Sequence, residues 1–305
     1  MAKARALDNR RKSIRNIKKI TRTMELIATA RFKKAMDRAT AATAYTRRIT
    51  QLVTDLSQAG LSVSHPLLEG RESKGNATLL VLTANRGLCG GYNGGVVRAA
   101  VPRYRELKSE FTNLRLEMSG KRGISAFKFR KISMDDTFTQ FEDQPKYAEV
   151  EAIANQYLDA YATGELDRLE VVYTKFLTSS RQTPVIETLL PLGSIGDDQA
   201  EEGAAKTEQK GDDKKGGGDS MYEFLPSAES ILEEVVPASF RVKLFKCFLD
   251  AAVSEQIARM VAMKSATENA NDMIRTLSMS YNRARQSQIT GEIMEIIGGV
   301  EAMEG

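Results

Sequence analysis

The sequence has 305 residues, 42% of them hydrophobic, which is enough for a sizeable core and excludes a wholly disordered chain. The formal net charge is +4, but residues 1–48 carry 15 basic and 3 acidic residues, a net +12 that leaves −8 for the rest. No apolar run approaches the roughly 18 to 20 residues that span a bilayer, and no signal-peptide h-region follows the N-terminus. We expect a protein that is soluble or peripheral to a membrane.

Cysteine and histidine are too scarce to build a site. Cys89 and Cys247 are too few and too far apart for a disulfide framework or a zinc site, and His65 is the single histidine. A reducing, cytoplasmic setting fits this usage best. The Arg-rich, acid-poor N-terminus shares its composition with mitochondrial transit peptides, but it continues unbroken into a helical pattern and has few serines, so we do not assign one.

Both ends of the chain are expected to be long helices. Residues 1–59 and 238–290 contain neither Gly nor Pro, which allows helices of about 80 to 90 Å at 1.5 Å per residue. The first stretch has a seven-residue row of Leu7, Ile14, Thr21, Ala28, Ala35, Ala42, Ile49 and Leu56, and a second row of Ile17, Met24, Tyr45 and Leu52. The last stretch has rows of Met260, Thr267, Ile274 and Tyr281 and of Met263, Ala270, Leu277 and Ala284.

Two such heptad seams in one chain can pair as an antiparallel coiled coil. The seams are rich in Ala and Thr, and Arg10, Arg31 and Arg38 interrupt the second row of the first one. Small residues let helices approach closely but bury little apolar area per turn. We therefore expect a shaft that needs partners around it.

Between the helices, β-rich runs alternate with helical stretches, as in an α/β domain with a mostly parallel sheet. The predicted strands are residues 77–84, 114–120, 168–176 and 185–192, and the predicted helices lie near 96–109 and 147–163. The charged, glycine-rich residues 197–219 are expected to form a solvated, mobile insertion. The sequence thus predicts a shaft helix over 1–59, a Rossmann-like α/β domain over 60–225 and a second shaft helix over 226–305.

The glycine-rich segment RGLCGGYNGG, residues 86–95, follows the first predicted strand, where nucleotides bind in many α/β proteins. Gly90 and Gly95 have the spacing of P-loop glycines, but Val96 and Val97 stand where Lys and Ser or Thr would reach the phosphates. A Gly-x-Gly-x-x-Gly fingerprint is absent as well. We therefore expect no nucleotide or other cofactor at this turn.

We assign no chemical role to two further features of the central region. Cys89 has no base within reach that could activate it as a nucleophile, so we expect a small buried thiol in a tight turn. The segment SGKRG, residues 119–123, has a basic pair between glycines that could contact an anion, but a solvated turn after a strand explains it equally well, so we assign it no chemistry.

The basic N-terminal helix leaves three kinds of partner open. A +12 stretch can bind nucleic acid, an anionic membrane surface or acidic proteins. Its basic residues lie all around the helix, and only Phe32 and Tyr45 could stack on bases. Charge alone does not choose among these partners.

Three segments together resemble the γ subunit of F-type ATP synthases of the bacterial type: residues 13–35, residues 86–93 and the long stretch 254–299. The resemblance extends over the chain except for the insertion. It implies the central rotor shaft, which couples ion flow through the membrane c ring to ATP synthesis or hydrolysis in the α/β hexamer. It also implies α, β and ε subunits and the c ring as partners, no catalytic residue, no metal and no cofactor, and a peripheral position on the cytoplasmic face of the inner membrane.

The resemblance also implies roles for particular residues. Contacts with the β subunits fall on Met24, Arg259, Arg285, Gln286, Thr290 and Glu292. An apolar tip inside the sleeve of the hexamer comprises Ile289, Ile293, Ile296, Ile297 and Val300. A strand-to-helix turn near the hexamer and ε comprises Arg86, Gly87, Cys89, Gly90 and Gly91.

The insertion departs from the redox-regulated members of this family, because it contains no cysteine. A thiol switch is therefore not expected. Two other classes remain as alternatives: a basic coiled-coil protein that binds nucleic acid, and a Rossmann-fold enzyme with a degenerate loop.

Overall fold

The computed structural model describes residues 2–58, 66–68, 71, 75–141, 144–192 and 228–304. The predicted insertion over 197–219, the predicted domain boundaries near 59 and 225, and His65 all lie outside these ranges and stay predictions. The chain divides into two compact units, which we describe separately. One comprises Met1–Arg31, Leu88–Gly90 and Gln256–Gly305, and the other comprises Phe32–Gly87 and Gly91–Glu255.

Both long helices are present. Helix α1 covers Ala2–Gln58 and helix α6 covers Ala228–Glu304, with Pro237 in its early part. The absence of Gly and Pro from most of their length is the reason that neither breaks, since these residues are the least favourable inside helices.

The sheet has five strands: β1 (Asn76–Leu82), β2 (Asn113–Ser119), β3 (Asp136–Phe138), β4 (Arg168–Thr178) and β5 (Arg181–Leu190). Their order is β3-β2-β1-β4-β5. Strand β1 pairs in parallel with β2 and β4, and β2 pairs in parallel with β3. Only β5 runs antiparallel, as the second arm of a hairpin with β4. The α/β prediction is confirmed.

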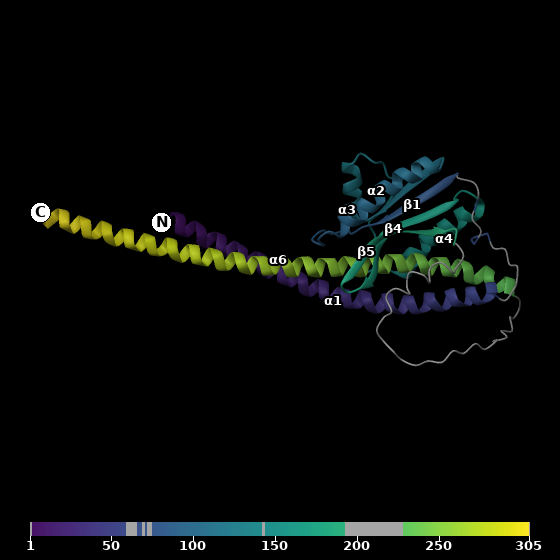
Figure 1. Cartoon of the computed structure of the whole chain (residues 1–305), viewed down its shortest axis with the longest axis horizontal. Coiled ribbons are helices and arrows are strands. Elements are labelled where there is room, and N and C mark those ends of the chain that lie inside the picture. Colours follow the sequence, from purple (N-terminus) through teal and green to yellow (C-terminus); the bar gives the residue numbers. More distant parts are fainter. Residues whose placement is uncertain are drawn as a thin grey trace, which may run out of the picture. The chain divides into compact units, whose positions relative to one another are not determined.

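Helices cover both faces of the sheet (Figure 1). Helices α2 (Tyr92–Glu110) and α3 (Lys121–Phe129) pack on one face, where Leu79, Val96 and Phe127 are fully buried. Helix α4 (Tyr147–Thr163) and the early part of α6 pack on the other, around Leu80, Tyr161 and Phe240. Each buried aliphatic or aromatic side chain of this kind contributes about 1.5 to 3 kcal/mol, so the two clusters hold the three layers together.

Two elements of this domain were not predicted. Strand β3 has only three residues and shows no alternation that a sequence pattern could detect. The interpretation of SGKRG as a solvated turn is wrong: Ser119 ends β2, and Lys121 already begins α3. The two glycines obscured the helix start, because glycine is unfavourable in helices unless packing requires it.

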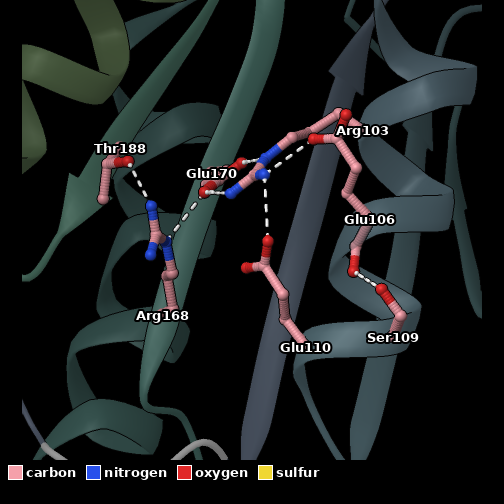
Figure 2. Close-up of polar contacts among 7 residues, drawn as sticks. All are labelled: Arg103, Glu106, Ser109, Glu110, Arg168, Glu170 and Thr188. Atoms are coloured by element: carbon pink, nitrogen blue, oxygen red, sulfur yellow. Dashed lines mark hydrogen bonds and ion pairs between the residues drawn. The ribbon is translucent and has the colours of Figure 1, made fainter.

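One ion-pair network joins α2 to β4 (Figure 2). Glu170 on β4 is 1% exposed, and Arg103 of α2 donates to both of its oxygens, from Nε and Nη2 at 2.8 Å each. Arg168 Nε lies 2.7 Å from the same carboxylate, and Arg103 also pairs with Glu106 at 2.9 Å. Hydrogen bonding to Glu170 raises the pKa of Arg103 above its ordinary value. This bidentate pair fixes α2 on the sheet.

We expect Glu170→Gln to destabilise the α/β domain by about 3 to 5 kcal/mol, because it leaves two guanidinium groups beside a buried neutral amide. Urea unfolding followed by circular dichroism measures the loss. Arg105→Ala, on the exposed side of the same helix, is the matched control and should change stability by less than about 0.5 kcal/mol. Equal losses in the two variants would contradict a structural role for the Glu170 network.

Candidate functional site

The turn after β1 is tight and packs against α6. Leu88 and Gly90 have positive φ angles of 65° and 55°, and Cys89 between them is 2% exposed, as predicted for a buried thiol. A Cβ added to Gly90 would lie 3.7 Å from Ala262 Cβ and 3.9 Å from the Ala258 carbonyl oxygen, both on α6. Gly91 then stands at the N-cap of α2. This turn therefore anchors itself on the shaft helix.

The residues after the turn face the core. Val96 is fully buried and Val97 is 3% exposed, both in the cluster between α2 and the sheet. Side chains at these two positions cannot reach a phosphate at the turn. Their burial agrees with the residue-type argument against a P-loop.

The first N–H groups of α3 already have acceptors inside the chain. The backbone N–H groups donate from Lys121 to Asn85 Oδ1 at 3.1 Å and from Arg122 to the Ala84 carbonyl at 3.1 Å. The next donates from Gly123 to Thr83 Oγ1 at 2.9 Å. A helix N-terminus binds an anion through these groups. A phosphate at α3 would have to displace three existing hydrogen bonds.

The ends of β1 and β2 also lie too close together for a ligand to enter between them. A Cβ added to Gly120, whose φ is 98°, would lie 2.1 Å from the Thr83 carbonyl oxygen. Thr83 Oγ1 in turn donates to the Ser119 carbonyl at 2.7 Å. Sequence reasoning missed Thr83 and Asn85, because residues of these types after a strand normally cap the next helix, whereas here they cap α3, which begins 36 residues after Asn85.

A buried carboxyl near the end of β2 also has a hydrogen-bond partner within the chain. Glu117 is 4% exposed and accepts a hydrogen bond of 2.5 Å from the hydroxyl of Tyr157 on α4. Burial raises the pKa of Glu117, and the bond from Tyr157 partly opposes this. Acidic residues at this end of β2 bind ribose in dinucleotide folds, but this one is covered by α4. No group of three or more His, Cys, Asp or Glu side chains that could hold a metal ion occurs among the described residues.

The two shaft helices run antiparallel. Thr267 of α6 donates a 2.8 Å hydrogen bond to Thr21 of α1, and both residues are under 10% exposed. Further along, Arg11 lies over the ring of Tyr281, 4.7 Å from its centroid. Moving toward the start of α1 therefore means moving toward the end of α6. The predicted antiparallel coiled coil is confirmed.

The predicted seam is only half correct on α1. Its first row faces α6, with Thr21 and Ala28 buried. The second row does not: Ile17 is 48% exposed and Met24 is half-buried. The second row of α1 residues that faces α6 is offset from the first row by four positions instead of three, and it includes the half-buried Arg11. Heptad spacing reveals a row of apolar residues, but it does not say which face the partner covers.

The end of α6 has no partner among the described residues. The register set by Thr21 and Thr267 places the start of α1 opposite residues near 286–290, and Figure 1 shows α6 continuing past that point. Every residue from Ile289 to Val300 is exposed. The exposed apolar side chains of this tip are Ile289, Ile293, Met294, Ile296, Ile297, Val300 and Met303. A stripe of this size on a single helix is expected to mark an interaction surface.

The other site residues differ in accessibility. Arg285, Gln286, Thr290 and Glu292 are exposed on α6, with Thr290 Oγ1 donating to the Gln286 carbonyl at 3.0 Å. Arg259, by contrast, is 6% exposed and is not free of partners within the chain. In the turn, Arg86, Gly90 and Gly91 are exposed, and Gly87 lies against the guanidinium of Arg122.

Within the described ranges, no helix is long and apolar enough to span a bilayer. A family model described as ATP synthase matches residues 3–303. The ATP synthase gamma chain of Rhodopirellula baltica is 65% identical over 307 residues, covering 100% of both chains. The ATP synthase gamma chain of Leptospira biflexa is 35% identical and covers 99% of this chain and 100% of its own.

Solved structures share the fold at low sequence identity. A chain from the Euglena gracilis mitochondrial ATP synthase, described as OSCP/F1/c-ring, has a TM-score of 0.63 at 20% identity and covers 99% of this chain and 95% of its own. A chain from the Tetrahymena thermophila central stalk and c-ring has a TM-score of 0.53 at 19% identity, covering 81% and 99%. With the sequence relatives matched from end to end, this chain belongs to the family of ATP synthase gamma chains.

Proposed function

We propose that this chain is the central rotor shaft of an ATP synthase, turning inside a hexamer of α and β subunits and coupling it to the membrane c ring. The observation that carries the proposal is the unpaired apolar tip of α6, whose five predicted residues, Ile289, Ile293, Ile296, Ile297 and Val300, are between 43% and 67% exposed. An apolar surface that makes no strong directional bond can be enclosed by a sleeve and still rotate within it.

The α1–α6 pair supports the same proposal. Its inner face is built from small side chains such as Thr21, Ala28 and Ala270. Small residues bring the helices close together, so that the pair is thin, but they bury little area per turn. A narrow pair of helices that is stabilised by the subunits around it suits a shaft that turns inside a hexamer.

We assign the catalytic step to other subunits. The turn after β1 and the start of α3 have the shape of a nucleotide-binding fold, but the first N–H groups of α3 already donate to Thr83, Ala84 and Asn85, and the turn packs against α6 at Gly90. The α/β domain then serves as the foot of the shaft, in contact with ε and the c ring. The complex lies on the cytoplasmic face of the membrane, and this chain has no catalytic residue.

Contacts with the β subunits are proposed at Arg285, Gln286, Thr290 and Glu292, which are exposed, and at the half-buried Met24. Arg259 is the weakest member of the proposed set, because burial keeps its guanidinium away from a partner surface. We assign Arg259 a positioning role in the shaft. The turn residues Arg86, Gly87, Cys89, Gly90 and Gly91 are proposed to lie near the hexamer and ε.

We expect the double variant Ile293→Asp/Ile297→Asp to lose its place in the complex, because an apolar sleeve cannot solvate two carboxylates. Native mass spectrometry of the complex purified through β measures how much of this chain is retained. Ser287→Asp, exposed on the same helix, is the control and should be retained normally. Full retention of the double variant would refute the apolar sleeve.

Arg285→Ala is expected to keep the subunit composition unchanged while lowering the ion gradient produced per ATP hydrolysed. Exposed ion pairs contribute only about 0.2 to 1 kcal/mol each, so losing one does not dissolve the complex, yet repeated weak contacts can transmit torque. Hydrolysis and ion pumping are measured on the same membrane vesicles, with Arg283→Ala, exposed on the same helix, as the matched control. Unchanged coupling, or loss of the chain from the complex, would disprove this role.

A further inference from the structure

The end of α3 presents an aromatic side chain to solvent. Phe129 is 88% exposed, whereas Phe127, two residues earlier, is fully buried between α3 and the sheet. A large apolar side chain this exposed within an ordered domain gains nothing from the fold itself. It therefore points to a surface that the α/β domain contacts with Phe129.

The backbone after Phe129 is held in a fixed turn. The backbone N–H groups of Arg130 and Ile132 both donate to the Phe127 carbonyl, at 3.0 and 3.1 Å, and that of Lys131 donates to the Lys128 carbonyl at 3.0 Å. Lys131 takes a positive φ of 58° to close this turn. Because Phe127 anchors the helix in the core, Phe129 projects from a preorganised support.

The surroundings of Phe129 are strongly basic. Lys128, Arg130 and Lys131 are all exposed, and residues 121–134 contain five basic residues and no acidic one. The next carboxylates are already engaged, Asp135 by the Leu116 N–H at 2.7 Å and Asp136 by Arg115. The ion pairs among the described residues involve none of these three cations, and Arg130 Nη1 donates to the Ala126 carbonyl of α3 at 2.9 Å. We call Lys128, Phe129, Arg130 and Lys131 the basic aromatic tip.

We propose that the basic aromatic tip binds the surface of a bilayer containing anionic phospholipid, with Phe129 at the level of the headgroups and the three cations among the phosphates. An aromatic ring flanked by Lys and Arg is the arrangement that favours the boundary between headgroups and acyl chains. Each cation near an anionic leaflet adds about a fivefold gain in partition. This direct membrane contact goes beyond the proposed rotor function, which connects the chain to the membrane only through the complex.

The shape of the tip favours a lipid surface over a macromolecular partner. A specific protein interface buries roughly 800 Å² on each side, and a four-residue convex turn offers far less. Single-stranded nucleic acid stacks successive bases on several aromatic side chains, whereas the tip has one. A bilayer needs no complementary shape, and because lipids are fluid it also sets no preferred angle for a turning shaft.

A single-tryptophan variant tests the proposal directly. The natural sequence contains no tryptophan, so Phe129→Trp in the full chain reports on this position alone. We expect its emission to move to shorter wavelength, and to be quenched by brominated lipid, on vesicles of phosphatidylcholine with phosphatidylglycerol but not on pure phosphatidylcholine. Leu177→Trp, at a half-exposed apolar position on β4, is the matched control and should show neither change.

Removing the cations tests their contribution. In the Phe129→Trp background, Lys128→Gln/Arg130→Gln/Lys131→Gln should lower partition onto the anionic vesicles about a hundredfold, at about fivefold per cation. Ile293→Ser in the same background should leave the tryptophan signal intact, because the apolar tip of α6 is a different surface. No spectral change on anionic vesicles, or an equal change with soluble polyglutamate or an oligonucleotide, would overturn the lipid assignment.

This test is independent of the rotor proposal. If Phe129→Ser removes vesicle binding while the chain still purifies with its complex, both proposals stand. If Phe129→Trp gives no lipid signal but the complex assembles and pumps normally, only the lipid contact fails.

Discussion

The close pairing of α1 and α6 is the constraint on which the rest of the structure depends. Threonine and alanine at the contact, including the bond from Thr267 to Thr21, let the two backbones approach closely. Such a contact is long but buries little apolar area in each turn, so the pair is thin and only moderately stabilised by itself. It also stops where α1 begins, which leaves the last turns of α6 as a single exposed helix.

The α/β domain has the sheet order and the glycine-rich turn of a nucleotide-binding architecture, but its own side chains and backbone fill the space at the ends of β1 and β2. Close contact between Gly120 and Thr83 shuts the space between the ends of β1 and β2, and three chain acceptors occupy the first N–H groups of α3. The turn at Gly90 is instead packed against α6. The same loop that would hold a phosphate in an enzyme therefore fastens the chain onto its own shaft.

Charge plays two opposite roles in this domain. At Arg103 and Glu170 it is buried and bidentate, so it fixes one helix on the sheet and would be costly to break. At Lys128, Arg130 and Lys131 it is exposed around an aromatic ring, and the side-chain hydrogen bond of Arg130 is local, from Nη1 to the Ala126 carbonyl at 2.9 Å. The contrast separates charges that maintain the structure from charges that are available to a surface outside the chain.

The sequence by itself determined that the chain has a long helix at each end and an α/β domain between them, because helix breakers and β-rich runs are local properties, although α6 continues through Pro237 and Gly291 beyond the stretch free of breakers. Only the tertiary structure decided that the row containing Ile17 faces solvent, since heptad spacing is the same on every face of a helix. It also decided that Asn85 caps α3 and that Arg103 meets Glu170, pairs separated by 36 and 67 residues. Such contacts form only when β1, β2 and β4 come together in one sheet, with α2 as the helix that connects β1 to β2. No local sequence pattern contains that information.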